Sequence, residues 1–414
     1  MKVTIVCDVL GVENNGTTIA AMNLINALKR QGHEVKVLCA DQDKKGLDGY
    51  YIVPNRHFGK AIDKLVAKVG VSLAKPDDDI VREAVKDADV VHLLVPFKLS
   101  QHALAICKEL GIPTTAGFHM QAENFTSYFK LNKSKLANHA VYKYIYKKVY
   151  KDVDGIHYPT KFIRDVFEKN IKKQTPGYVI SNGVNAYVEK RDVEKPEEYK
   201  DKIVLLSIGR LAREKSQDTL LKAVNYSKYR DKIQVILAGQ GLKEKYYRKL
   251  GKKLPITPIM KLFPRDEIIN VINYADLYIH PADVELEGIS CLEAIACGKM
   301  TIVSNSKTSA TKDFAAGPEC IFKKRNPKDL ARVIDYFLDN PKEKEKFEKI
   351  YLQNAHVYRQ EECMKQMEEM MKTVIKNKKK WNNHMFVSNN WNYQNKEFRN
   401  TPNSFYLVSN AFVY

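Results

Sequence analysis

The sequence lacks several patterns that would assign it quickly to a class of protein. No stretch approaches about 18 uncharged apolar residues, so neither a membrane-spanning helix nor a cleaved secretory signal is expected. The seven cysteines are odd in number, widely scattered and form no CxxC pair, which indicates buried thiols in a reducing cytosol. The dinucleotide-binding fingerprint GxGxxG is also absent. We therefore expect a cytoplasmic protein.

Length and charge narrow the remaining classes. At 414 residues and 44% hydrophobic content, the chain is too long for one ordinary core and is expected to form two domains. The formal net charge of +19 favours an anionic partner, which could be a phosphorylated ligand, an anionic membrane or nucleic acid. Net charge alone does not choose among these three.

Short continuous apolar runs alternate with stretches of helical periodicity along most of the chain. Such runs are typical of strands buried on both faces, and their alternation with helices predicts an α/β fold with parallel sheets. A charged segment at 189–202 divides the runs into two sets, so we expect two doubly wound domains, 1–188 and 189–354, facing each other across a cleft. The expected strands are 3–7, 35–39, 90–95, 113–118, 155–158, 178–180, 203–208, 233–238, 256–260, 277–280 and 300–303.

Two loops of the first domain are candidate ligand contacts, because ligands of such sheets bind beyond the carboxyl ends of the strands. Gly16 follows the first strand, and a glycine lets a ligand approach the backbone, although an ordinary tight turn explains it equally. His119 follows the strand at 113–118, where a neutral imidazole could hydrogen-bond to a hydroxyl group. The alternative for His119 is a histidine that merely caps the strand end.

Two basic stretches of the first domain, 60–73 and 131–151, combine lysines with apolar residues at helical spacing. In the second stretch the spacing predicts that one face packs on the domain while lysines and tyrosines face outward. The apolar residues of that face are Leu136, Val141, Ile145 and Val149. Interfacial helices on anionic membranes have this pattern, and so do ordinary solvated helices.

In the second domain, Arg210 and Lys215 lie in the loop that follows the strand at 203–208. A rigid guanidinium fork and a mobile ammonium group are together suited to binding a diphosphate. Basic residues are common in loops, so the pair gains weight only beside the residues described next.

Residues 285–293 read ELEGISCLE and lead from a loop into a helix. The helix start offers free N–H groups and a positive dipole end to an anion, while the carboxylates of Glu285 and Glu293 could accept hydrogen bonds from hydroxyl groups. That combination describes a nucleotide-sugar site. Taken alone, the stretch is more simply explained as a strand, a loop and a capped surface helix with acidic residues near its positive end.

The C-terminal part divides at residue 380. Residues 355–380 predict a long helix returning toward the first domain, with a methionine face expected to belong to the core. Residues 381–414 hold both tryptophans and nine asparagines and fit no period, so we expect a disordered tail. The methionine face expected within 355–380 consists of Met364, Met367, Met370 and Met371.

These motifs together resemble the retaining glycosyltransferases of family 4, which have the GT-B fold. The resemblance covers nearly everything from residue 1 to about 375. It rests on GRLAREK at 209–215, similar to the family's diphosphate signature, on E-x7-E from Glu285 to Glu293, its defining motif, and on SNGV at 181–184, GPECIF at 317–322 and NPKDLA at 326–331.

The motif departs from the family's common form E-G-F-G, because Leu286 and Glu287 follow Glu285 here. ELEGISCLE is closer to the E-x-x-G-L form of diacylglycerol glucosyltransferases. HMQAEN at 119–124 similarly resembles the segment around the active-site histidine of those lipid-modifying enzymes. The role of Glu287 stays open.

The resemblance implies a role for each site residue of the second domain. Glu285 would contact hydroxyl groups of the donor sugar, and Glu293 would contact the ribose. Arg210 and Lys215 would hold the diphosphate and stabilise its charge as it leaves. The remaining donor contacts would lie at the helix start, at Gly288, Ile289 and Ser290.

In the first domain the resemblance implies that Gly16 lets the donor approach and that His119 lies by the sugar and the acceptor. No metal and no cofactor are expected, since Arg210, Lys215 and the helix dipole would take the metal's place and no DxD-like motif stands at a strand end.

The implied activity is retaining hexosyl transfer from a nucleotide diphosphate sugar, such as UDP-glucose or a related UDP-hexose, to a hydroxyl group of a membrane lipid or cell-envelope glycan. The enzyme would contact the anionic inner face of the membrane through 60–73 and 131–151, and no nucleic acid is expected as a partner. Three alternatives stay open: a family member with a soluble or polysaccharide acceptor, a basic nucleic-acid-binding protein, and a non-catalytic sugar-nucleotide-binding protein.

Overall fold

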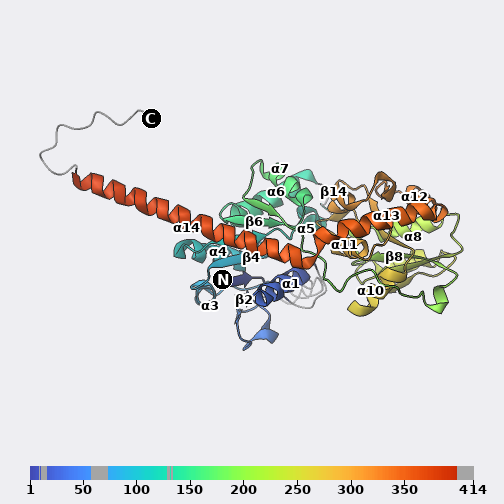
Figure 1. Cartoon of the computed structure of the whole chain (residues 1–414), viewed down its shortest axis with the longest axis horizontal. Coiled ribbons are helices and arrows are strands. Elements are labelled where there is room, and N and C mark those ends of the chain that lie inside the picture. The colour runs from blue at the N-terminus through green and yellow to red at the C-terminus, as the bar shows by residue number, and fades with distance from the viewer. Residues whose placement is uncertain (9, 11–15, 57–72, 128–130, 132–133, 399–414) are drawn as a thin grey trace.

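The computed structural model describes residues 1–398 except 9, 11–15, 57–72, 128–130 and 132–133. Two parallel sheets form two separate lobes, and a long C-terminal helix runs along the first lobe (Figure 1). Among the described residues, no helix has both the length and the apolar character needed to cross a membrane.

The sheet of the first lobe has seven strands, and every neighbouring pair is parallel. In spatial order they are β3 (Tyr50–Ile52), β2 (Glu34–Cys39), β1 (Lys2–Val6), β4 (Val90–Leu93), β5 (Thr114–Gly117), β6 (Gly155–Tyr158) and β7 (Gly177–Val179). The helices of this lobe are α1 (Gly16–Arg30), α3 (Asp78–Val85), α4 (Lys98–Leu110), α5 (Ala122–Ser127), α6 (Lys135–Ile145), a π-helix, η2 (Tyr146–Tyr150), and α7 (Lys161–Ile171).

Helices cover both faces of this sheet, as the continuous apolar runs predict. Successive residues of β1 point to opposite faces, so Ile5 belongs to one buried cluster and Val6 to the other. The cluster that contains Ile5 also contains Leu24 of α1 and Met367 of the C-terminal helix. Doubly wound packing of this kind leaves only the strand ends for ligands.

The second lobe has a six-stranded parallel sheet and a separate two-stranded ladder. The six strands, in spatial order, are β10 (Ile259–Lys261), β9 (Ile233–Ala238), β8 (Ile203–Ile208), β11 (Leu277–His280), β13 (Thr301–Ser304) and β15 (Ile321–Phe322), and the ladder pairs β12 (Val284–Glu285) with β14 (Thr308–Ser309). The helices are α8 (Gln217–Val224), α9 (Glu244–Gly251), α10 (Arg265–Tyr274), α11 (Ile289–Ala296), α12 (Pro327–Asp339) and α13 (Pro341–Asn354).

The last helix, α14 (Gln360–Phe398), packs against the first lobe. Its methionines 364, 367, 370 and 371 are buried in the same cluster as β1 and α1. The sequence predicted disorder from residue 381, whereas α14 continues to Phe398. No glycine or proline interrupts the chain between 360 and 398, so nothing in the backbone chemistry ends the helix earlier.

The prediction for 131–151 is partly wrong. Ile145 and Val149 are buried, but Leu136 is 80% exposed, and Tyr142 and Tyr150 are buried although tyrosines were expected to face outward. Both tyrosines have polar partners inside: the Tyr142 hydroxyl donates to a Glu123 carboxylate oxygen (2.8 Å) and the Tyr150 hydroxyl to the Gly117 carbonyl (2.9 Å). The wider π-turn at Tyr146–Tyr150 also changes the helical spacing. The other basic stretch, 60–73, lies outside the described residues up to 72.

All seven cysteines are buried and none of them forms a disulfide, which confirms the expectation of buried thiols.

Candidate functional site

The centre of the site is a contact between three side chains from three different elements of the second lobe. Lys215 ends the short 3-10 helix η4 (Arg213–Lys215) after β8, Glu285 ends β12, and His280 ends β11. The Lys215 ammonium group forms an ion pair with the Glu285 carboxylate, and His280 Nε2 lies 3.2 Å from the same carboxylate oxygen. The carboxyl ends of parallel strands meet at one edge, which brings these residues together.

The Glu285 carboxylate is held in its charged form. Burial alone would raise the pKa of Glu285, but the Lys215 ammonium group and His280 outweigh burial and lower it to about 2. Burial lowers the pKa of His280 and keeps the imidazole neutral, against the opposing effect of Glu285. An ionised carboxylate only accepts hydrogen bonds, so Glu285 suits hydroxyl donors and not proton transfer at neutral pH.

A chain of hydrogen bonds ties this cluster to the start of α11. The Tyr278 hydroxyl lies 3.1 Å from His280 Nδ1 and 3.2 Å from Ser290 Oγ, and Ser290 Oγ in turn donates to the Ile208 carbonyl (3.2 Å). Ser290 is therefore engaged with the end of β8 rather than directed at open space. Its backbone N–H, with that of Ile289, belongs to the first turn of α11, where helix N–H groups have no partner within the helix.

Gly288 makes the close approach between these elements possible. It caps α11 with a left-handed backbone (φ 90°), and a Cβ there would lie 2.6 Å from Thr311 Cγ2 and 3.1 Å from Glu285 Cγ. Any larger residue would displace Glu285 as well as strain the backbone. This glycine thus places the carboxylate directly beside the helix N-terminus.

Arg210 lies in the loop between β8 and η4. It follows β8 and forms an ion pair with Glu214 (3.0 Å), with half of its side chain exposed. The backbone around it is tightly packed, since a Cβ at Gly239 would lie 2.1 Å from the Gly209 carbonyl oxygen. The structure therefore joins Lys215 directly to Glu285 but places Arg210 in a different ion pair.

Glu293 is buried on α11 and forms an ion pair with Arg265, the first residue of α10. Arg265 also donates to the Tyr187 hydroxyl (3.1 Å). The carboxylate expected to bind a ribose is thus engaged by a guanidinium group. A ribose hydroxyl group would have to share or replace that contact.

His119 belongs to the other lobe and follows β5. Its loop reaches the second lobe, because Gln121 Nε2 donates to the Thr308 carbonyl (3.1 Å), and Thr308 pairs with Val284 in the ladder that carries Glu285. Burial, and then the nearby His157 and His92, lower the pKa of His119 well below its usual value, so its imidazole is neutral. A neutral imidazole can either donate a hydrogen bond to a hydroxyl group or accept one from it.

Gly16 is the first residue of α1, and residues 11–15 before it lie outside the described residues.

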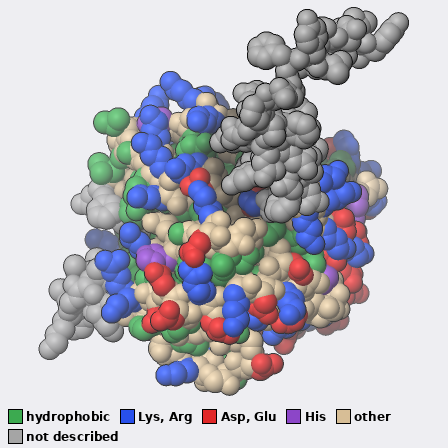
Figure 2. All heavy atoms as spheres, turned by 90° about the vertical axis from the view of Figure 1, so that its left-hand side faces the viewer, with side chains coloured by type: hydrophobic (Ala, Val, Ile, Leu, Met, Phe, Trp, Pro, Cys, Tyr) green, Lys and Arg blue, Asp and Glu red, His purple; other side chains and the backbone are tan. Residues whose placement is uncertain are grey.

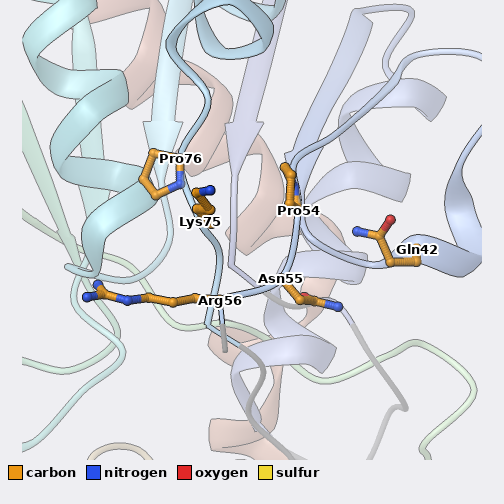
Figure 3. Close-up of a pocket in the computed structure, with 6 residues that line it drawn as sticks. All are labelled: Gln42, Pro54, Asn55, Arg56, Lys75 and Pro76. Carbon is orange, nitrogen blue, oxygen red and sulfur yellow. The ribbon is translucent and has the colours of Figure 1, made fainter. Parts of the chain in front are cut away.

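Farther along the same sheet edge, a pocket of about 830 Å³ opens after β2 and β3 (Figure 3). Its lining includes two basic residues, Arg56 and Lys75, together with Gln42, Pro54, Asn55 and Pro76.

Three residues of the site carried no role in the sequence analysis. His280 stands at the end of an expected strand, where ligands of parallel sheets bind, so its position in the sequence could have indicated it. Arg265 had no such signal, because its contact with Glu293 comes from two distant helices. Glu287 is buried and bonded to the first lobe, which nothing in the local sequence indicates. Within the described part of the chain, no three His, Cys, Asp or Glu side chains gather as a metal site.

Two parallel α/β lobes with a cation–carboxylate cluster at a strand edge define the architecture of a GT-B glycosyltransferase. Comparison with protein families agrees: the model of glycosyltransferase family 4 matches residues 14–187, and that of the group 1 glycosyl transferases matches residues 188–351. The chain belongs to this family of glycosyltransferases.

The similar proteins include one that is named for the synthesis of a glycolipid and one that is named as a mannosyltransferase. The chain is 25% identical over 319 residues to the alpha-monoglucosyldiacylglycerol synthase of Streptococcus pneumoniae, covering 73% of this chain and 70% of that protein. It is 24% identical over 312 residues to a GDP-mannose-dependent alpha-mannosyltransferase of Corynebacterium glutamicum, covering 73% of this chain and 72% of the relative. Among solved structures, Anabaena HepE in complex with UDP aligns over 90% of this chain and all of that one, with a TM-score of 0.70. At 15% identity, the likeness to HepE shows the fold alone.

Proposed function

We propose that this protein transfers a hexosyl group from a nucleotide diphosphate sugar, a UDP-hexose such as UDP-glucose, to a hydroxyl group of a membrane lipid or cell-envelope glycan, with retention at the anomeric carbon. The observation that carries the proposal is the contact of Lys215 and His280 with the ionised Glu285 at the N-terminus of α11. It combines positive charge for a diphosphate with an acceptor for sugar hydroxyl groups.

In this proposal Lys215 exchanges Glu285 for the diphosphate when the donor binds. Arg210, Lys215 and the α11 dipole then stabilise the charge that develops on the departing diphosphate, without a metal ion. Glu285, released from Lys215, accepts hydrogen bonds from sugar hydroxyl groups and orients the anomeric carbon, while Glu293 accepts from the ribose. The acceptor hydroxyl attacks from the face that the diphosphate leaves, beside His119. The bond from the anomeric carbon to the diphosphate oxygen breaks as the bond to the acceptor oxygen forms, and the acceptor's proton passes to the departing phosphate oxygen.

The relatives support a lipid-linked or envelope acceptor. The pneumococcal relative is named for a glucosyldiacylglycerol, and a Campylobacter jejuni relative, 24% identical over 261 residues, is named for transfer to a diphospho-undecaprenol. The pocket of Figure 3 lies on the acceptor-side lobe, and its two basic residues suit a polar or anionic head group.

The surface of the first lobe supports contact with an anionic membrane. Lys143, Lys147 and Lys148 are exposed along α6 and the π-helix, near exposed Leu136 and Tyr144. Figure 2 shows Lys and Arg side chains spread over the face at the α14 end of the molecule, with hydrophobic side chains and also Asp and Glu side chains among them. Basic charge interleaved with exposed apolar groups is typical of peripheral association with the inner membrane face.

A donor panel tests the proposal. UDP- and GDP-linked glucose, galactose, mannose and N-acetylglucosamine are supplied with diacylglycerol vesicles, with polyprenyl phosphate or with no acceptor, and released nucleotide is measured with and without EDTA. We expect release with one UDP-hexose that increases with a lipid acceptor, survives EDTA and gives an α-linked product by NMR. Absence of release above that of Lys215→Ala with every donor would overturn the assignment.

A further inference from the structure

Glu287 occupies an unusual place for a carboxylate within a surface loop. It lies between β12 and α11, two residues after Glu285, yet only 3% of the residue is exposed. Its carboxylate accepts three hydrogen bonds from the other lobe: from Ser181 Oγ (2.6 Å), from the Asn182 backbone N–H (3.0 Å) and from Asn182 Nδ2 (2.5 Å). Three donors aimed at one carboxylate form a built site for this side chain.

Ser181 and Asn182 belong to the connection between the two lobes, where the chain crosses twice. The first crossing continues through Val184, whose N–H donates to the Tyr358 carbonyl (2.7 Å), and Gln360 N–H donates back to the Val184 carbonyl (2.9 Å). Glu287 therefore binds the hinge at the point where the outgoing and returning chains are bonded to each other.

The neighbouring residue is fastened to the first lobe as well. The Leu286 carbonyl accepts a hydrogen bond from Thr160 Oγ1 (2.9 Å), and the Leu286 side chain packs against the core cluster of the first lobe. Leu286 and Glu287 are the two residues that separate Glu285 from Gly288. The two residues that differ from the family's common motif are thus the segment that docks on the other lobe.

We propose that Glu287 is a positioning residue that fixes the donor-binding loop to the interdomain hinge, so that the orientation of the lobes is transmitted to Glu285. The kinetic consequence rests on the proposed glycosyl transfer, whereas the docking itself does not. A shift of the hinge would move the Glu287 carboxylate, and the two-residue link to Glu285 would carry that shift into the sugar site. Misplacement of a binding group by about 1 Å costs up to about 100-fold in rate.

Three substitutions of Glu287 distinguish the effect of its contact with the hinge from the effect of its negative charge. Glu287→Gln keeps the length, and the Asn182 amide, which donates to the Glu287 carboxylate in the wild type, can turn to accept from the new Nε2. Glu287→Asp keeps the charge but is one methylene too short, and Glu287→Ala removes every bond. We expect the kcat of Glu287→Gln to stay within about threefold of the wild-type value. Glu287→Asp and Glu287→Ala should each lose about 10- to 100-fold in kcat, with a smaller change in the donor KM.

Hydrogen–deuterium exchange of peptides covering 181–184 gives a readout that does not need activity. We expect faster exchange of the Asn182 amide in Glu287→Ala and Glu287→Asp, and near-native protection in Glu287→Gln. Glu343→Gln, which removes a carboxylate from the surface of α13, is the matched control and should change neither readout.

Two results would overturn the proposal. If Glu287→Asp is active and Glu287→Gln is inactive, the Glu287 carboxylate contributes its negative charge to donor binding and does not act by holding the loop on the hinge. If all three variants match the wild type in exchange and in kcat, the contact positions nothing. Should the wild-type protein release no nucleotide from any donor, the proposed function fails, while the exchange data still decide whether Glu287 docks the hinge.

Discussion

At the scale of single residues, the most direct prediction concerns Lys215. Its side chain and that of Glu285 are 17% and 14% exposed, so their ion pair is only weakly screened by solvent. We predict that Lys215→Ala lowers kcat/KM by about 100- to 1,000-fold, the cost typical of losing one group that stabilises transition-state charge. Released nucleotide measures the loss, and circular dichroism checks the fold. Lys222→Ala, which removes an exposed lysine paired with Asp218 on α8, is the control and should keep full activity.

A second prediction concerns the placement of His119. A Cβ at Gly117 would lie 2.5 Å from His119 Nε2 and 3.5 Å from His92 Nε2, so Gly117→Ala must push the His119 ring away from its position. We expect kcat to fall by about tenfold or more while the protein stays folded. In a His119→Ala background the same glycine change should cost nothing further. An equal loss in both backgrounds would show that Gly117 acts through some other contact.

The sequence indicated the site residues that lie in the loop after an expected strand or in a recognisable motif. Lys215, in the loop after 203–208, and Glu285, in the E-x7-E motif, belong to this group, and the structure joins them. The contacts made after the helices pack could not be predicted. Arg265 reaches Glu293 from another helix, and Glu287 reaches Asn182 across the lobes, so neither pairing has a local period or motif.

At the scale of elements, strands buried on both faces were the easiest to predict. The expected bounds 155–158, 203–208, 233–238 and 277–280 agree with β6, β8, β9 and β11. The strands that were missed, β3, β12, β14 and β15, have two or three residues each, too few to show an apolar run. The π-turn that follows α6 was missed for a related reason, since a single wide turn shifts the burial of the residues after it, such as Tyr150, without changing the composition.

The C-terminal helix carries a prediction about stability. The buried side chains of α14 extend to Val374, and Lys378 forms an ion pair with Asp154 of the first lobe (2.8 Å). We expect a chain that ends after Lys380 to keep the melting temperature and nucleotide release of the full protein. A chain that ends after Arg359 should lose several kcal/mol, because about five methionine and cysteine side chains leave the core. Destabilisation by the shorter truncation would show that residues beyond 380 contribute to the fold.

At the scale of the whole molecule, Glu287 makes the joined lobes sensitive to pH. Burial raises the pKa of Glu287 to about 7, against the lowering effect of Ser181 and Asn182, and the nearby Glu285 raises it further. Cys363 of α14 and Tyr358 also face it, and burial raises the pKa of each, so both are neutral. The folded pKa therefore exceeds the unfolded value of about 4.3.

The direction in which stability changes with pH follows from this difference between the folded and unfolded pKa values. A raised folded pKa stabilises the protein fully below about pH 4.3, and that stabilisation is lost as pH rises through about 7, a total on the order of 4 kcal/mol. We predict that, from pH 5.5 to pH 8, the melting temperature of the wild type falls relative to that of Glu287→Gln. Asp8, whose pKa burial also raises to about 7, is present in both proteins and cancels. A constant difference across this range would contradict the assignment.

The net charge of +19 is a property of the whole molecule, but membrane binding depends on where that charge lies. Lys143, Lys147 and Lys148 are exposed, and each lysine near an anionic surface contributes about 1 kcal/mol. Changing all three to Gln should therefore weaken sedimentation with phosphatidylglycerol vesicles roughly 100-fold, and phosphatidylcholine vesicles should bind neither protein. Gln at the exposed α13 lysines 342, 346 and 349 makes the same change in net charge on the other lobe and should leave binding intact. Equal loss in both triple variants would mean that binding follows total charge and not the surface of α6.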